Sequence, residues 1–311
     1  MQLSITAPIF LMIALGYGAV RLGIFPKAMV PGLGQFVLFF AVPALIFRTL
    51  MNADFSQVLN PTFLAVYAAG GVGTMLLALF TFRKVMGRPF THSAYFALGC
   101  SFPNSIFVGL PVLLQIFHGQ PPAAFAMALM VENIVLLPLG MILMELGGED
   151  VGTDSLRKTL KAIGLRLLKN PILMALLAGI LAAAVDLQLP EVIDKVIVTL
   201  GNASSGTALF FIGGVLVGSD WRKHLSILGG IASGKLLLHP LLIAAIVWLL
   251  PPFDPDLTLS VMVLASAPMA AIYPILGNKF GLAEEGANAM LVTTASSFIT
   301  LTAILWILTP G

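Results

Sequence analysis

Three ionisable residues lie deep within long apolar segments of the sequence: Glu132, Lys235 and His239. A charged group at the centre of a membrane helix costs about 2.5–3.5 kcal/mol on insertion scales, so such residues usually face a partner or a cavity. A carboxylate or an imidazole can carry a proton, and an ammonium group can hold an anion. The functional interpretation is a site for an anionic substrate and a coupling ion. The structural alternative is a buried polar cluster that holds the helices together.

The positions of these residues along their segments allow them to meet. Lys235 and His239 are four residues apart and therefore share one face of a helix. Glu132 and His239 lie at similar depths from the ends of their segments, and the long side chain of Lys235 can reach that level. The sequence does not tell whether the two helices are neighbours. The proline after His239 offers a simpler role for the imidazole, as partner of an unpaired backbone carbonyl.

The composition indicates an integral membrane protein. The 311 residues are 59% hydrophobic and 10% charged, with a mean hydropathy of +1.01, whereas soluble domains have roughly 25% charged residues. The net charge of +2, without a basic block, excludes nucleic acid as a partner. The single cysteine excludes an intramolecular disulfide and a cysteine metal cluster. No phosphate-binding loop or clustered histidine motif is present, so no cofactor, bound metal or enzyme activity is predicted.

Apolar windows of about 20 residues, the length that crosses roughly 30 Å of hydrocarbon, predict ten membrane spans. They lie at 3–22, 31–51, 61–82, 91–117, 122–144, 168–187, 193–217, 225–250, 257–280 and 284–308. Thirteen of the 16 lysines and arginines fall in the odd-numbered connections, Arg48 and Lys195 fall in the even-numbered ones, and Lys235 lies within a span. Because cytoplasmic loops are rich in positive charge, we expect a multi-pass protein of the cytoplasmic (inner) cell membrane with both termini outside.

The order of the spans predicts an inverted repeat. The polar connection at 145–170 divides the chain into a first half at 1–147, a cytoplasmic linker at 148–167 and a second half at 168–311. Five spans per half is an odd number, so the second half must enter the membrane in the opposite orientation. "APIFLMIALGYGAVRLGIFP" and "NPILMALLAGILAAAVDLQLP" open the two halves with similar proline spacing. The predicted fold is therefore an all-α membrane protein with ten transmembrane helices in two inverted five-helix repeats.

The fourth and ninth spans correspond in this repeat, and both contain residues that break helices. They carry "SFPNSIFVGLPVLL" and "SAPMAAIYPILGNKFG". Proline removes a backbone donor, and paired broken helices in inverted halves point to a transporter's binding site. Two such crossover helices would aim amino ends and free carbonyls at one place, where an anion and a cation can bind. A plain kink in two packed helices is the structural alternative.

These patterns define the candidate site residues. The candidates for substrate binding are Asn104, Ser105, Gly109, Pro111, Tyr273, Pro274 and Lys235. The candidates for the coupling ion are Glu132, Asn133, His239, Ser101 and Pro268. Carbonyls of broken helices suit sodium, whereas Glu132 and His239 suit protons, so the sequence leaves the coupling ion open.

The motif Asn-x-x-x-x-Gly-x-Pro in "NSIFVGLP", from Asn104 to Pro111, resembles the fourth span of the auxin efflux carrier family. "APMAAIYPILGNKFG" followed by "ANAMLVTTASSFITLTAI" resembles its ninth and tenth spans, and "AVPALIF" its second. The resemblance implies a fold like that of the bile acid/sodium symporters, with a scaffold domain and a crossover domain. It implies that Asn104, Pro111 and Pro274 line the crossover site. Two departures are a shorter central loop than in the long plant exporters, and Thr207 where the repeat would place proline.

Together, these features predict a secondary active transporter that works by alternating access. The expected substrate is a small organic anion such as malonate or malate, coupled to H+ or Na+. An anion channel through the same crossover and, with less support, an intramembrane enzyme are the alternatives. A homodimer through the scaffold domain is an alternative to a monomer.

Overall fold

The computed structural model describes residues 2–52, 59–119, 123–147, 153–218, 222 and 224–308. In that part of the chain the secondary structure is helical, apart from one isolated β-bridge. The elements of the first half are α1 (Gln2–Arg21), η1 (Lys27–Met29), α2 (Val30–Phe36), η2 (Val37–Ala41), α3 (Val42–Met51), α5 (Pro61–Phe80), η3 (Thr81–Val85), α6 (Phe90–Ser101), η4 (Ser105–Gly109), α7 (Leu110–Ile116), α8 (Ala123–Val131), η5 (Glu132–Leu136) and α9 (Leu137–Leu146). Those that follow are α10 (Thr153–Leu168), α11 (Pro171–Ala184), α12 (Glu191–Val215), α13 (Leu225–Ser233), η6 (Gly234–Leu238), α14 (His239–Leu249), α15 (Pro255–Ser266), α16 (Tyr273–Gly277), η7 (Asn278–Phe280) and α17 (Ala283–Leu308).

Long apolar helices confirm an all-helical integral membrane protein. Among the described residues, six continuous helices are long and apolar enough to cross a membrane, or seven when α10 and α11 count as one bent span. Shorter apolar helices occur at Ile5–Arg21, Ser105–Ile116 and Pro255–Ser266. The count of ten spans in two inverted repeats stays a prediction.

Helix-breaking prolines account for four widened helical turns in the structure. The π-helical segments η2, η4, η5 and η6 each end two residues before a proline, namely Pro43, Pro111, Pro138 and Pro240. Proline lacks an N–H and clashes with the carbonyl one turn earlier, so the helix widens there. Ser105, Glu132 and Lys235 all lie in such turns. Local proline chemistry thus shapes the backbone that carries these polar side chains.

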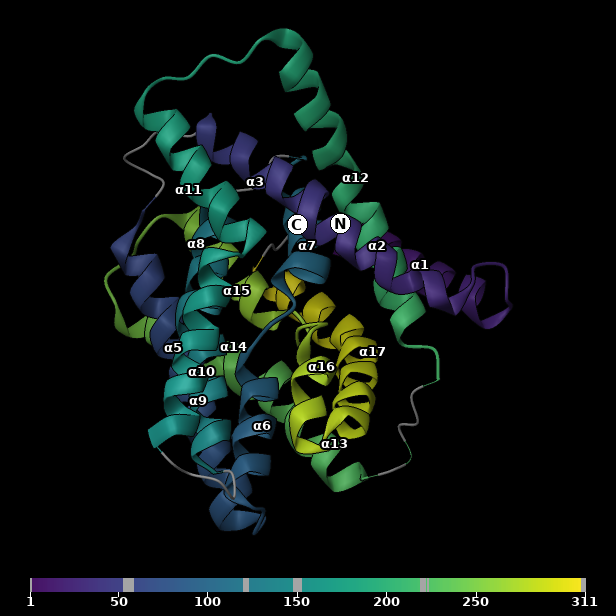
Figure 1. Ribbon diagram of the computed structural model, residues 1–311, viewed down its shortest axis with the longest axis vertical. Helices are drawn as coiled ribbons and strands as arrows, with labels where there is room; N and C mark the ends of the chain where they lie inside the picture. The colour runs from purple at the N-terminus through teal and green to yellow at the C-terminus, as the bar shows by residue number, and fades with distance from the viewer. Residues whose placement is uncertain are drawn as a thin grey trace.

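The helices pack as two groups (Figure 1). In the first group, α1 packs against α12, and α3 packs against both α11 and α12. In the second group, α5 contacts α6 and α14, α6 contacts α9, α15 contacts α14, and α17 contacts α13 and α16. The groups meet where α12 contacts η4 and α7, and where α1 contacts α17. The interrupted helix that contains η4 and α7 therefore lies at the junction between the two groups.

The connection between the halves contains a helix. Residues 148–152 of the expected linker lie outside the described residues, and the rest of it belongs to α10. Ile163 of α10 is buried, α10 packs against α9, and the axis bends by 49° between α10 and α11. An apolar stripe on an otherwise basic segment explains why this connection packs against the bundle.

Glycines allow the closest approach within the first group. A Cβ atom on Gly213 of α12 would collide with backbone atoms of Ile13 and Tyr17, and one on Gly16 of α1 would collide with the backbone of Phe210. Small residues at a membrane helix interface let two backbones approach closely. The contact between α1 and α12 therefore depends on glycine from both helices.

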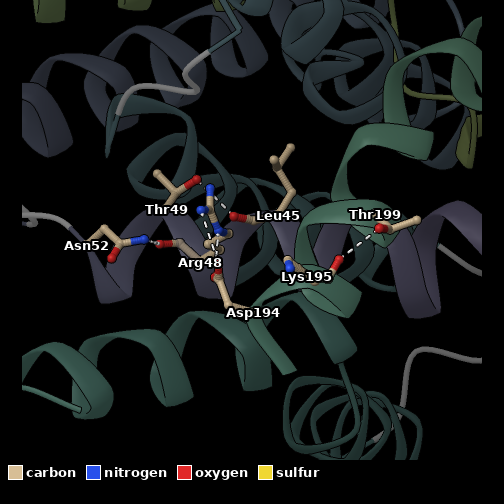
Figure 2. A network of polar contacts seen from close by, with 7 residues as sticks. All are labelled: Leu45, Arg48, Thr49, Asn52, Asp194, Lys195 and Thr199. Atoms are coloured by element: carbon tan, nitrogen blue, oxygen red, sulfur yellow. Dashed lines mark hydrogen bonds and ion pairs between the residues drawn. The ribbon is translucent and has the colours of Figure 1, made fainter. Parts of the chain in front are cut away.

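An ion pair joins α3 to α12 in the same group (Figure 2). Arg48 Nε lies 2.9 Å from Asp194 Oδ1, and Arg48 Nη2 lies 3.3 Å from Asp194 Oδ2. The arrangement is bidentate, yet the two side chains are 39% and 34% exposed. Solvent therefore screens much of the attraction between them.

We expect Arg48→Gln to lower the free energy of unfolding by about 0.5–1 kcal/mol, the upper part of the range for partly exposed pairs. Thermal unfolding of the purified protein in detergent measures the change. Lys195→Gln is the matched control, because Lys195 pairs with Glu191 on a highly exposed surface, and it should leave the melting temperature unchanged. Equal destabilisation by both variants would show that the Arg48–Asp194 pair has no special role.

Candidate functional site

Two interrupted helices meet at their breaks. α6 ends at Ser101 and η4 begins at Ser105, while α15 ends at Ser266 and α16 begins at Tyr273. The intervening segments form an antiparallel bridge between Pro103 and Met269. The Asn104 N–H donates to the Pro268 carbonyl at 2.7 Å, and the Ala270 N–H donates to the Phe102 carbonyl at 3.0 Å. Each break thus supplies a hydrogen-bond partner for backbone groups of the other break, as a membrane interior requires.

At this junction the side-chain amide of Asn104 has a hydrogen-bond partner for its oxygen but none for its nitrogen among the described atoms. Its Oδ1 accepts a hydrogen bond from the Phe107 N–H at 3.2 Å, which caps η4. Its Nδ2 is buried and has no hydrogen-bond partner among the described atoms. A buried donor without a partner is costly, so Nδ2 is a group that a bound anion could satisfy.

Glu132 forms a buried polar cluster with hydroxyl groups from two other elements. The Tyr67 hydroxyl of α5 donates to Glu132 Oε1 at 2.7 Å, and the Ser105 hydroxyl donates to the same oxygen. Glu132 is 3% exposed, and Tyr67 is fully buried. The two donors stabilise an ionised carboxylate, and the carboxylate can also accept a proton. Tyr67 is a site residue that the sequence analysis missed.

Lys235 and His239 form a second polar cluster beside the first. Lys235 Nζ donates to the Ala265 carbonyl at 2.7 Å and lies 2.9 Å from His239 Nδ1. This carbonyl lies in the last turn of α15, so the ammonium group binds a backbone acceptor near the helix break. The ring of Tyr67 lies 6.5 Å from the ring of His239. Tyr67 therefore lies between the cluster of Glu132 and the cluster of Lys235 and His239, whose direct contact the sequence allowed by depth but left open.

A cavity of about 720 Å³ opens at the junction of the two helix groups. Its walls are mainly apolar, with Leu38, Phe39 and Phe211 from the first group and Phe102 and Phe107 from the interrupted helix. The polar residues that line it are Asn104, Ser105, Glu132, Asn133, Arg166, Lys169 and Asn170. The cavity can therefore hold the carbon skeleton of an organic molecule beside a few polar groups.

The structure brings four of the sequence-predicted residues to the cavity wall: Asn104, Ser105, Glu132 and Asn133. Lys235 and His239 lie outside its described lining and bind each other. Arg166, Lys169 and Asn170 are lining residues that the sequence analysis did not select. They lie in the connection between the halves, where lysine and arginine were used only as an orientation signal.

The remaining predicted residues have structural contacts near the breaks. Tyr273 stacks on Tyr95 with ring centroids 4.1 Å apart, and each hydroxyl donates to the other residue's carbonyl. The Ser101 hydroxyl donates to the Ala97 carbonyl. The other candidates are Gly109, Pro111, Pro268 and Pro274, and none of them belongs to the described cavity lining. Their roles in binding stay predictions.

The fold and the site define a class of protein: a helical membrane protein with a substrate-sized cavity between two helix groups. Residues 3–307 match the model of a protein family described as "Membrane transport protein", and the chain belongs to this family. The resemblance to the auxin efflux carriers is thereby confirmed. The protein is a transporter and not an enzyme.

Three curated proteins illustrate what this chain is similar to. The "Putative malonate transporter" of Rhizobium meliloti (strain 1021) is 25% identical over 313 residues, which cover 99% of this chain and 96% of the relative. The "Lysosomal cholesterol signaling protein" of Mus musculus is 26% identical and covers 94% of this chain, but the match spans 36% of that protein. "Auxin efflux carrier component 2" of Arabidopsis thaliana is 28% identical over 47% of this chain and 23% of its own length.

Proposed function

We propose that the protein is a secondary carrier of small organic anions, namely dicarboxylates such as malonate or malate, that bind in the cavity beside the two helix breaks. The observation that carries this proposal is Asn104, a residue of the cavity wall whose buried Nδ2 has no hydrogen-bond partner among the described atoms. An amide donor next to an apolar wall suits a carboxylate attached to a short carbon skeleton. The full-length similarity to a protein named as a malonate transporter supports the same substrate class.

The proposed mechanism is alternating access, with the second helix group moving against the first. The helix contacts support an inverted repeat, because the same pairings recur with the halves exchanged: α1 with α12 corresponds to α11 with α3. In the same way, α5 with α6 corresponds to α14 with α15, and α6 with α9 corresponds to α15 with α17. The cavity takes lining residues from both groups, so their relative motion would open it to one side at a time.

The proposed orientation places the odd-numbered connections in the cytoplasm and both termini outside the inner membrane. The support is the distribution of lysine and arginine along the sequence.

Coupling to H+ or Na+ is part of the proposal, with Glu132 as the group that would carry a proton. The fold would allow a monomer, and the exposed first group is where a homodimer would form.

Counterflow in proteoliposomes tests the function. Vesicles preloaded with unlabelled malonate, malate, citrate or indole-3-acetate, without an ion gradient, are diluted into labelled malonate. We expect transient accumulation of label with a dicarboxylate preload, because a carrier exchanges substrates through one site. Downhill flux without exchange would instead indicate a channel, and no flux with any of these acids would refute the proposed substrate class.

A further inference from the structure

Two cationic side chains line the cavity from the connection between the halves. Arg166 lies in the last turn of α10, and the Lys169 N–H donates to the Leu165 carbonyl at 3.1 Å, so the helical backbone continues through Lys169. The two residues are three positions apart and lie on one side of the helix. Among the described lining residues they are the only lysine or arginine. Positive charge in the described cavity wall thus comes from α10 and its end.

Neither cation is neutralised by an acidic side chain in the described part of the chain. The nearest polar contact of Arg166 is from Nη1 to the Met141 sulfur at 3.9 Å, and a thioether is a weak acceptor. Arg48, by contrast, pairs with Asp194, and Lys279 pairs with Glu145. Arg166 is half-buried beside an apolar wall. An unpaired guanidinium in such a place favours the binding of an anion.

The other polar groups of this wall are engaged within the protein. Asn170 Nδ2 donates to Asn133 Oδ1 at 2.9 Å, and Asn170 Oδ1 accepts from the Ile172 and Leu173 N–H groups at the start of α11. The Glu132 carboxylate is held by the hydroxyls of Tyr67 and Ser105. Among the side-chain hydrogen-bond donors of this wall, those left to meet a ligand are therefore the two cations and the Asn104 amide.

We infer that Arg166 and Lys169 bind the carboxylates of the substrate and select dicarboxylates over monocarboxylates. A guanidinium can form two parallel hydrogen bonds with one carboxylate, and an ammonium one helical turn away can attract a second. Leu38, Phe39 and Phe211 supply the apolar wall for the carbon skeleton. This inference rests on the proposed function and names the side chains that would set its specificity.

The test compares malonate with propanoate, which has the same number of carbons and one carboxylate fewer. Half-saturating concentrations are measured by counterflow for the wild type, Arg166→Gln and Lys169→Gln. We expect each variant to raise the value for malonate by about tenfold, the loss of one charge-assisted contact, and to change the value for propanoate much less. Lys161→Gln is the matched control, because Lys161 is an exposed lysine of α10 outside the described lining. It should behave as the wild type.

Charge restoration separates binding from folding. Arg166→Cys is modified with 2-aminoethyl methanethiosulfonate, which adds a positive group, or with 2-sulfonatoethyl methanethiosulfonate, which adds a negative one. We expect the first reagent to recover malonate affinity and the second to weaken it further. The native Cys100 is buried. Wild-type protein treated with each reagent controls for any reaction at Cys100.

The possible results distinguish this inference from the proposed function. Wild-type exchange of malonate with unchanged affinity in Arg166→Gln and Lys169→Gln would refute the carboxylate contacts and leave the carrier intact. An equal loss in Lys161→Gln would attribute the effect to α10 as a whole and would also refute them. Wild-type protein that exchanges none of the dicarboxylates would overturn both the function and the inference.

Discussion

Replacement of Asn104 by leucine is expected to abolish saturable uptake of malonate. Leucine has the same branched arrangement of side-chain heavy atoms but no amide, so the unpaired Nδ2 donor of this lining residue disappears. The Phe107 N–H also loses the Oδ1 atom that caps η4, which costs about 1 kcal/mol for a typical cap. Uptake by proteoliposomes should fall to the level of empty vesicles.

A second variant separates anion binding from the cap. In Asn104→Asp the carboxylate can still accept from the Phe107 N–H, but it offers no donor and repels an anion. We therefore expect at least about a hundredfold lower affinity for malonate, the combined cost of a lost donor and a like charge in a dry site. We also expect a lower melting temperature, because Asn104 is buried and an unpaired buried carboxylate is costly. Asn52→Leu is the control, because its amide donates to the Arg48 carbonyl outside the cavity. Wild-type transport by Asn104→Asp would show that the amide does not bind substrate.

Glu132→Gln is expected to uncouple transport from a proton gradient. Glutamine retains an oxygen that can accept from Tyr67 and Ser105, so the buried contacts of this position can persist. It cannot exchange a proton, and the charged and titratable neighbours Tyr67, Lys235 and His239 already bind within the two clusters. Accumulation driven by an imposed pH difference should therefore fall to the level of empty vesicles, while counterflow without a gradient continues.

The pattern of results assigns the role of Glu132. In the wild type, acidic pH on the substrate side should increase uptake, because protonation of the carboxylate would accompany binding. Glu145→Gln is the matched control: Glu145 lies on the same span near its end and pairs with Lys279, so its loss should leave coupling intact. Wild-type uptake that follows a sodium gradient and ignores pH would contradict the role of Glu132 in proton coupling.

Local properties of the sequence account for the parts that were predicted well. Hydropathy identified a membrane protein because apolar runs of this length have few other uses. Motifs such as "NSIFVGLP" led to the family, which the match over residues 3–307 confirms. The prolines indicated where helices are disturbed, since a missing N–H and a clash with the preceding turn act within a few residues. Asn104 was selected from the interrupted fourth span, Ser105 as a small polar residue and Glu132 as an ionisable residue within an apolar span, and all three line the cavity.

The contacts between helices could not be obtained in this way. Depth along the spans allowed a contact of Glu132 with Lys235 or His239, but the hydroxyl partners of Glu132 are Tyr67 of α5 and Ser105 of η4. Lys235 binds the Ala265 carbonyl. The sequence did not mark Tyr67, because one tyrosine in an apolar span is usually part of the packing. In a lipid environment every helix face is apolar, so hydrophobic periodicity does not show which side of a helix meets its neighbour.

The sequence by itself thus determined the class of protein, its family and the places where its helices are interrupted, because these depend on composition and on short-range backbone chemistry. Only the tertiary structure decided which polar groups share a cavity. Arg166 and Lys169, which the sequence marked only as part of a positively charged connection, line the same cavity as Asn104. Tyr273, which the sequence marked as a binding residue, stacks on Tyr95 and is outside the described cavity lining. Such placements depend on how long helices rotate and cross, which is settled by packing between residues far apart in the chain.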